Sequence, residues 1–441
     1  MKTTKKLLIL CMGIVFLSCN FYDQEPDPKG AFPSLKIDLR KLYEKATQHN
    51  DHFSMVHLGW HYDTGTGVKQ DPREAANWYR MAAEKGGHSM AQNNLGCLYR
   101  DGRGVIQDYK RAASLFRLSS QQGNRHAKIN LGWLYERGYG LEINYSESLR
   151  LYSQAANERK DFQTGKMSPG HSMAQNNLGC LYRDGKGTKP DPMTAIKWFR
   201  KSANAGNQHG HYNLGRMYER GHGIKTDIRK ALEHYEIAVK SGNLYAINAV
   251  GSIFWEGKIV PKNPSLAADY FSLAADKDYS MAMYNLGILR LEGIGVKKDP
   301  IIAIEWMSKA AGKGNAYAQA KYAWMLEKGI GARQDYNEAV NWYKRAAEQG
   351  LALAQYRLAT LLYTGSEVEK DLISACKWMK VALKYGSREA RDFLPKIEQA
   401  MNDKQKKTAN LLVSKFVAQP NIEEISSGSD PQIETKSPKP Y

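Results

Sequence analysis

The chain has 441 residues, which is too many for one ordinary hydrophobic core, and length alone suggests two or three domains. Apolar residues make up 42% and charged residues 24%, which is normal for a soluble folded protein. The formal net charge of +18 favours acidic partners. Because the basic residues are spread along the whole chain, we interpret them mainly as solvated helix faces, with a dedicated anion site as the alternative.

The N-terminus has the layout of an export signal. Residues 2–6 include three lysines, residues 7–17 form an apolar run, and Ser18 is a small residue at its end. The run is too short for a membrane span of about 20 residues, so we predict a secretory signal peptide over residues 1–18.

The stretch that follows resembles a bacterial lipobox. Residues 16–19 read Phe-Leu-Ser-Cys, and the resemblance implies that Cys19 is acylated and anchors the chain to a membrane. By the same resemblance, Asn20 favours an outer-membrane lipoprotein that faces the periplasm or the cell surface. Plain secretion and a cytosolic leader are the alternatives. Residues 19–33 are rich in proline and are predicted to form a flexible, lipid-anchored tether.

Residues 34–50 are predicted to form an N-terminal capping helix, and a repeat begins after them. A small residue, usually preceded by Leu, recurs at steps of 36 or 37 residues apart from one step of 47. These anchor positions are Gly59, Gly96, Gly132, Gly179, Gly215, Gly251, Gly287, Ala323 and Ala359. They define nine repeats within residues 51–386, and the long step carries an insertion at 157–170.

Each repeat has the pattern of two helices joined by a turn. Glycines six and eight residues after the anchor, such as Gly102 and Gly104, can adopt positive φ and end the first helix. An Asp or Asn twelve residues after the anchor caps the second helix, which stabilises it by about 1 kcal/mol. Those residues are Asp71, Asp108, Asn144, Asp191, Asp227, Asn263, Asp299, Asp335 and Asp371.

An aromatic residue nineteen or twenty positions after the anchor is predicted to fill the seam between repeats, together with alanine pairs such as Ala82 and Ala83. We assign this role to Trp78, Phe116, Tyr152, Trp198, Tyr235, Tyr270, Trp306, Trp342 and Trp378. A helix–turn–helix unit of this period predicts an all-α fold, an α-solenoid that winds as a right-handed superhelix.

Residues 95–105, Leu-Gly-Cys-Leu-Tyr-Arg-Asp-Gly-Arg-Gly-Val, resemble the signature of the Sel-one-like repeat family, which is related to tetratricopeptide repeats. The resemblance covers about residues 34–418. It implies a scaffold or adaptor, which in bacteria often acts in the cell envelope, in exopolysaccharide export or in host interaction.

The chain ends in further helices and a polar tail. Residues 387–418 are predicted to form C-terminal capping helices, the last of them capped by Asn402 or Asp403, because an unfinished solenoid exposes its core. Residues 419–441 are predicted to be disordered. Residues 87–102 and 170–185 are identical, which we interpret as a duplicated pair of repeats, with two selected surface patches as the alternative.

By analogy with tetratricopeptide arrays, the first helices line a concave groove. Helical periodicity then directs the side chains six and three before the anchor, and one and four after it, into that groove. The predicted partner-binding residues are Trp60, Met90, Asn93, Arg100, Trp133, Met173, Asn176, Arg183, Tyr212, Arg216, Tyr245, Asn248, Trp255, Tyr284, Tyr317, Trp324 and Tyr356. Trp, Tyr and Arg are enriched at binding hot spots, although part of this set could be core.

These residues predict a cell-envelope scaffold that binds a protein or peptide in an aromatic-lined groove. The alternatives are a glycan-binding scaffold in exopolysaccharide export and, as a minor hypothesis, a weak hydrolase of the β-lactamase type. No catalytic residue, metal site or cofactor is predicted: His57 and His61 lack an acidic partner in a ligand pattern, and Cys97, Cys180 and Cys376 form no disulfide framework. No nucleic-acid partner is expected, because no basic stripe stands out.

Overall fold

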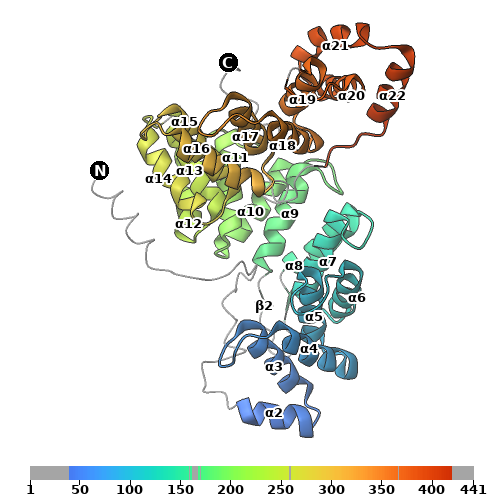
Figure 1. Ribbon diagram of the computed structural model, residues 1–441. Helices are drawn as coiled ribbons and strands as arrows, with labels where there is room; N and C mark the ends of the chain where they lie inside the picture. The colour runs from blue at the N-terminus through green and yellow to red at the C-terminus, as the bar shows by residue number, and fades with distance from the viewer. Residues whose placement is uncertain are drawn as a thin grey trace. The chain divides into compact units, whose positions relative to one another are not determined.

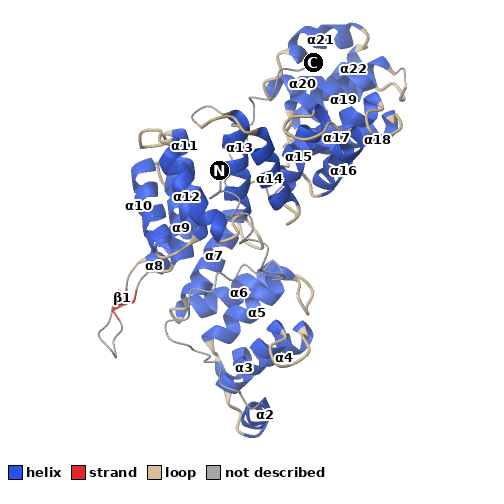
Figure 2. Cartoon of the chain, turned by 90° about the vertical axis from the view of Figure 1, so that its left-hand side faces the viewer, coloured by secondary structure: helices blue, strands red, loops and turns tan. Residues whose placement is uncertain are grey.

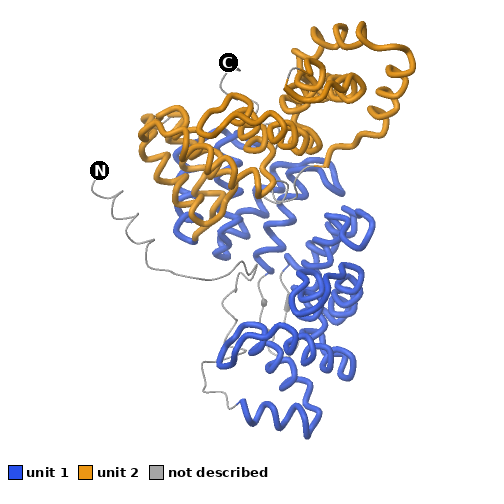
Figure 3. Tube along the Cα trace, in the orientation of Figure 1, with its two compact units in different colours: residues 1–241 blue, residues 242–441 orange. Residues whose placement is uncertain are grey.

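The computed structural model describes residues 39–157, 159–160, 167–168, 170–257, 260–365 and 367–419. The predicted signal peptide, the lipidation site Cys19, the tether, and all of the predicted tail except residue 419 lie outside the described residues. Figure 1 shows the described part as helices that follow one another in chain order. The chain divides into two compact units, Met1–Ser241 and Gly242–Tyr441, which are treated separately (Figure 3).

The first unit contains the predicted capping helix and the helix pairs of five repeats. Its helices are α2 (Leu39–Gln48), α3 (His52–Thr64), α4 (Pro72–Gly86), α5 (Ser89–Asp101), α6 (Tyr109–Gln121), α7 (Arg125–Arg137), α8 (Tyr145–Ala156), α9 (Ser172–Asp184), α10 (Pro192–Asn204), α11 (Gln208–Arg220) and α12 (Ile228–Lys240). From α3 onward, odd-numbered helices are the first helices of the repeats and even-numbered helices are the second.

The second unit contains the helix pairs of the other four repeats and two terminal helices. Its helices are α13 (Leu244–Glu256), α14 (Pro264–Ala275), α15 (Ser280–Glu292), α16 (Pro300–Gly312), α17 (Ala316–Lys328), α18 (Tyr336–Glu348), α19 (Ala352–Thr364), α20 (Leu372–Lys384), α21 (Glu389–Gln399) and α22 (Asp403–Ser414). The prediction of an all-helical repeat fold is therefore confirmed, whereas a right-handed superhelical course of the whole array stays a prediction.

The predicted caps of all nine second helices are confirmed. Each of the Asp and Asn side chains predicted to cap accepts a hydrogen bond from a backbone amide in the first turn of the helix that follows. Five first helices are capped in the same way by residues that the sequence analysis did not assign, namely Asp51, Asn124, Asn207, Asn243 and Asn315. Local hydrogen bonding thus sets where most helices begin.

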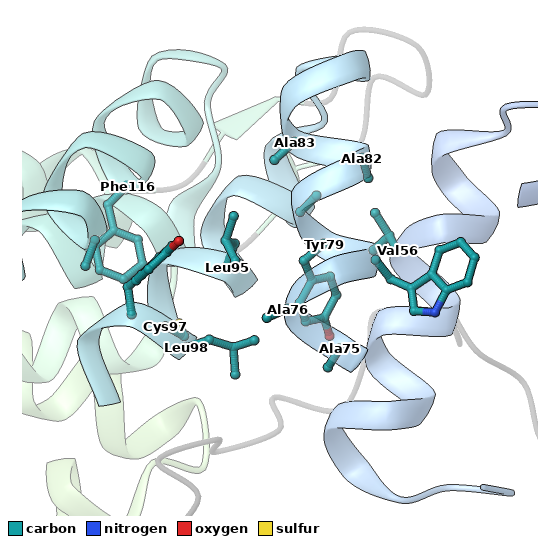
Figure 4. Packing of buried hydrophobic residues seen from close by; sticks show 14 of the residues in the cluster. Val56, Ala75, Ala76, Tyr79, Ala82, Ala83, Leu95, Cys97, Leu98 and Phe116 are labelled. Atoms are coloured by element: carbon teal, nitrogen blue, oxygen red, sulfur yellow. The ribbon is translucent and has the colours of Figure 1, made fainter. Parts of the chain in front are cut away.

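The buried residue between the two helices of a repeat is the assigned aromatic in three repeats, Phe116, Tyr152 and Tyr235, and stands one position after it in the other six. The residue that is buried against the anchor stands twenty after it in every repeat, and each is 0–1% exposed: Tyr79, Phe116, Tyr152, Phe199, Tyr235, Phe271, Met307, Tyr343 and Met379. A Cβ added at Gly59 would lie 2.5 Å from a ring carbon of Tyr79, so the absence of a side chain is what admits the ring. Figure 4 shows Tyr79 and Phe116 within this packing, among the buried alanines.

The tryptophans assigned to the seam one position earlier need a correction, because one step along a helix rotates a side chain by about 100° away from the seam. Trp198, Trp306 and Trp342 are only half-buried. Trp78 and Trp378 are buried because end segments cover them: the ring of Tyr43 lies 5.3 Å from that of Trp78, and the ring of Phe416 lies 5.3 Å from that of Trp378. Tyr270 is half-buried and stacks on Phe254.

In six repeats the second glycine of the turn packs against the preceding repeat, namely Gly104, Gly140, Gly187, Gly223, Gly295 and Gly331. Gly104 has φ +68°, and a Cβ there would lie 2.2 Å from the backbone carbonyl of Pro72, at the start of α4. Gly67 occupies the same place in the first repeat with φ +73°, but its nearest neighbour would be a side-chain atom of Leu39 at 3.6 Å. The glycine therefore serves both the turn and, in these six repeats, the close approach of neighbouring repeats.

The insertion emerges between α8 and α9. Its described residues include two short strands, β1 (Arg159–Lys160) and β2 (Met167–Ser168), which pair antiparallel, and Figure 2 shows β1 standing away from the helices. At its base a Cβ on Gly170 would lie 1.7 Å from the carbonyl oxygen of Ala156, so only glycine fits there. Sequence reasoning located this insertion but did not predict a hairpin.

The C-terminal segment covers the end of the second unit. Asn402 caps α22 in a capping box with Gln405, as one of the two predicted alternatives had it. Beyond α22 the chain returns to the repeats, where Phe416 packs on Trp378 and the amide of Gln419 donates to the carbonyl of Glu348 at 2.9 Å. The exposed end of the repeat core is thereby closed.

Candidate functional site

All of the predicted groove residues lie on first helices, α3 to α19, as the sequence analysis expected. Most of them are half-buried, and Met90 is exposed. Four are corrected, because they are buried and contribute little surface: Asn93 and Arg216 are 5% exposed, and Asn176 and Tyr212 are 8% exposed. Helical periodicity alone could not separate groove positions from contacts with the next repeat.

The buried asparagines form a polar junction between neighbouring first helices. Asn130 on α7 donates to the side-chain oxygen of Asn93 at 3.0 Å and accepts from Arg100 at 3.0 Å, both on α5. Arg100 also donates to Asp101, at 2.6 and 2.9 Å. Asn93 and Arg100 therefore have structural partners within the array, and the amide of Asn130 connects two consecutive repeats.

The same junction recurs two repeats later. Asn213 on α11 donates to Asn176 at 2.8 Å and accepts from Arg183 at 3.1 Å, both on α9. The interacting side chains on α5 and α9 belong to the two identical sixteen-residue stretches. The stretches thus supply the same contact twice, and that contact lies largely inside the array, so two selected surface patches are not needed to explain them. In a third pair, Asn285 donates to the side-chain oxygen of Asn248 at 3.0 Å. Asn248, a predicted groove residue, therefore also has a partner within the array.

A second structural pairing involves the position four after the anchor. It is acidic wherever the buried seam residue is Tyr: Asp63 with Tyr79, Glu136 with Tyr152, Glu219 with Tyr235, and Glu327 with Tyr343. The hydroxyl donates to the Glu carboxylate at 3.3, 2.5 and 2.9 Å in the last three pairs. Where the seam residue is Phe or Met, the position holds Arg100, Arg183, Trp255, Leu291 or Tyr363.

In the three Glu pairs the carboxylate offsets the cost of burying a hydroxyl without an acceptor, whereas the Tyr79 hydroxyl makes no hydrogen bond to Asp63. The acids also receive cations from the next repeat, since Arg103 forms an ion pair with Asp63 at 2.5 Å and Lys186 forms one with Glu136 at 3.3 Å. The acidic residues on the first helices are therefore largely engaged within the array.

The half-buried aromatic residues, with exposed Met90 and half-buried Met173, are the part of the prediction that still offers a surface. In the first unit the aromatic residues are Trp60 and Trp133; the guanidinium of Arg100 lies 5.9 Å from the Trp133 ring, and Tyr139 packs on its edge at 5.2 Å. In the second unit they are Tyr245, Trp255, Tyr284, Tyr317, Trp324 and Tyr356. Tyr356 is partly covered, because Phe393 of α21 lies 6.3 Å from it.

Nine segments of the chain match the Sel1 repeat: residues 52–87, 89–124, 125–159, 172–207, 208–243, 244–279, 280–315, 316–351 and 352–384. The chain belongs to the Sel1 repeat family. Sel1 repeats generally mediate interactions between proteins. No curated protein matches the chain.

Three solved structures are similar to this Sel1 repeat chain. A protective antigen present in uropathogenic Escherichia coli strains, which displays an SLR fold, is 27% identical over 91% of this chain and 90% of that one, with a TM-score of 0.45. A Sel1 repeat protein from Oxalobacter formigenes is 29% identical over 53% of this chain and 92% of that one, with a TM-score of 0.47. An immunity protein from Pseudomonas aeruginosa is 22% identical over 48% and 75%, with a TM-score of 0.35.

The histidines of the first Sel1 repeat are packed inside it. His57 is 6% exposed and His61 is 5% exposed, so neither ring offers much surface to a partner. Burial, with smaller contributions from His61 and His88, lowers the pKa of His57 to about 4, so the ring is neutral at pH 7. Within the described residues no three His, Cys, Asp or Glu side chains are placed to hold a metal ion.

The three cysteines of the repeats are free thiols. Burial raises the pKa of both the Cys180 and the Cys376 thiol, which disfavours the reactive thiolate. Across the described part of the chain, no helix combines the length and the apolar character that a membrane crossing requires.

Proposed function

We propose that this Sel1 repeat protein is a scaffold of the cell envelope, without enzymatic activity, which binds a partner protein through the half-buried aromatic residues of its first helices. The single observation that carries the proposal is the set Trp60, Trp133, Trp255 and Trp324. These indoles stand on first helices, keep part of their surface accessible, and exceed what the seams use, because the seams are filled by other residues. Partly exposed tryptophans of this kind supply large contact areas at interfaces.

In each unit the proposed binding surface comprises fewer residues than the sequence predicted. The polar groups of Asn93, Asn176, Arg100 and Arg183 are bound within the array, so the aromatic side chains are the residues we expect a partner to contact. Such faces also suit a sugar polymer, which is why competition by oligosaccharide belongs in the experiment below.

The test is a crosslinking pull-down from native cells with the quadruple variant Trp60→Ala, Trp133→Ala, Trp255→Ala and Trp324→Ala. We expect partner proteins that wild type captures to fall by about tenfold or more, because removing a hot-spot aromatic typically costs 2 kcal/mol or more. The matched control is Trp198→Ala, Trp306→Ala and Trp342→Ala, three half-buried tryptophans on second helices, which should leave the captured partners unchanged.

An unchanged set of partners with the quadruple variant would show that the first-helix aromatics are structural. Equal losses with both variants would point to a general loss of stability rather than to a binding face. Release of the partner by oligosaccharide, but not by peptide, would favour the glycan-binding alternative.

We also propose that the chain is exported and acylated at Cys19, as an outer-membrane lipoprotein. The support is the order of the N-terminal residues: three lysines, an apolar run, and a small residue before Cys19. Cells grown with an alkyne-bearing palmitate should label wild type, and Cys19→Ser should remove the label completely. A wild-type protein that takes up no label would contradict the anchor and favour plain secretion or retention in the cytosol.

A further inference from the structure

Lys321 lies on the aromatic face of the second unit, where it packs on Trp324. On α17 it stands four residues after Tyr317 and three before Trp324, so helical periodicity directs all three side chains to one face. The Nζ atom of Lys321 lies 4.0 Å from the centre of the Trp324 ring. The neighbouring first helix contributes Tyr284, whose ring lies 6.3 Å from that of Tyr317.

Two similar pairs on second helices provide a comparison. Lys309 lies 4.6 Å from the Trp306 ring on α16, and Lys201 lies 5.0 Å from the Trp198 ring on α10. Both of those lysines are exposed to solvent, whereas Lys321 is half-buried. Lys377 on α20, 4.0 Å from the Trp378 ring, is also half-buried, and there the ring of Phe416 from the C-terminal segment lies 5.5 Å from its Nζ. A cation–π contact alone therefore does not require the burial that Lys321 has.

The ammonium group of Lys321 is partly desolvated, and no ion pair within the described residues offsets the free-energy cost of that desolvation. Burial lowers the pKa of Lys321, and the smaller contribution of the Glu292 carboxylate acts in the opposite direction. Lys321 forms no ion pair with any carboxylate among the described residues, unlike Lys328, whose Nζ lies 2.8 Å from Glu327. A partly desolvated charge becomes favourable when a carboxylate with good geometry reaches it.

Apart from the carboxylate of Glu292, the neighbouring first helix α15 offers few polar groups. The four groove positions of α15 hold Met281, Tyr284, Ile288 and Leu291, which include no polar side chain other than one phenol. The nearest acid on the same helix, Glu327, is 6% exposed and already accepts from Tyr343. The hydroxyl groups of a sugar acid would find few hydrogen-bond partners here. The apolar side chains of a peptide need no such partners.

We propose that Lys321 is the anchor for a carboxylate side chain of an acidic peptide segment in the partner, with an aromatic or aliphatic residue of that segment packed on Trp324 and Tyr317. This inference rests on the proposed function and names the chemistry of the ligand at that face. The overall positive charge of the chain favours the approach of such a segment.

The test begins with a phage-displayed library of random dodecapeptides selected on the full chain. Selected sequences should contain Asp or Glu next to an aromatic or aliphatic residue. Each is then synthesised with the acid and with its amide counterpart, and the Kd is measured by fluorescence anisotropy with wild type, Lys321→Met and the matched control Lys309→Met.

We expect Lys321→Met to weaken the acidic peptides by about tenfold, and Lys309→Met to change the Kd less than about twofold. The amide peptides should bind wild type about tenfold more weakly and should no longer distinguish wild type from Lys321→Met. Because the amide peptides are tested on the unaltered protein, this arm stands even if the Lys321 variant folds poorly. Lys321→Arg, which retains the charge, should recover most of the affinity.

The inference is overturned if no peptide is selected, if the selected peptides lack acids, or if Lys321→Met binds them as wild type does. A Trp255→Ala and Trp324→Ala variant separates this failure from that of the proposed function. If the peptides lose affinity for the tryptophan variant but keep it for Lys321→Met, the proposed role of the aromatic residues stands and only the role of Lys321 is contradicted. Peptides that bind both variants normally would contradict both proposals.

Discussion

Substitution of Gly104 by alanine is expected to lower the free energy of unfolding by about 3 kcal/mol, and substitution of Gly67 by only about 1 kcal/mol. Both glycines have positive φ, +68° and +73°, so both variants pay the same backbone strain. Only the alanine at 104 would also place a methyl group 2.2 Å from the backbone of Pro72. Since that neighbour is backbone at the start of α4, it cannot rotate away, and the two repeats must separate.

Urea unfolding followed by helical circular dichroism measures both variants against wild type. Gly67→Ala is the matched control, because the first repeat has no repeat before it to be displaced. Equal losses for the two variants would mean that the second glycine serves only its own turn, and that the close approach of repeats contributes nothing to stability.

Replacement of Glu327 by leucine is expected to lower the free energy of unfolding by about 2 kcal/mol, because it leaves the buried Tyr343 hydroxyl without its acceptor. Tyr343 is 1% exposed and donates to Glu327 at 2.9 Å. The double variant Glu327→Leu and Tyr343→Phe should recover about half or more of that loss. It resembles the combination in the repeat of α15 and α16, where the apolar seam residue Met307 accompanies Leu291.

The measurement is a double-mutant cycle by urea unfolding, with Tyr343→Phe as the fourth corner. Glu305→Leu, at an exposed position of α16, is the control and should change the free energy of unfolding by less than about 0.5 kcal/mol. Additive effects of the two substitutions would show that the hydroxyl and the carboxylate are not coupled, and the pairing across the nine repeats would then need another cause.

The pairing of acids with tyrosines was present in the sequence but was not recognised there. The four repeats with Tyr at the seam are the four with Asp or Glu sixteen residues earlier, and the other five lack the acid. The groove residues were predicted only from the direction in which each side chain points on its own helix. Comparing two positions across all repeats would have identified Glu136, Glu219 and Glu327 as partners of buried hydroxyl groups.

The sequence by itself determined the features that depend on a few consecutive residues. The nine repeats, the caps of the second helices such as Asp71, and the glycine turns were predicted correctly, because capping and positive φ are local properties of the chain. Only the tertiary structure decided which side chain fills the seam, Tyr79 rather than Trp78. It also decided which predicted groove residues form hydrogen bonds with the next repeat. Asn93 and Asn130 are 37 positions apart, and their hydrogen bond exists only once two repeats have stacked. Periodicity predicts the direction of a side chain on its own helix, whereas its burial is set by the neighbour that packs against it.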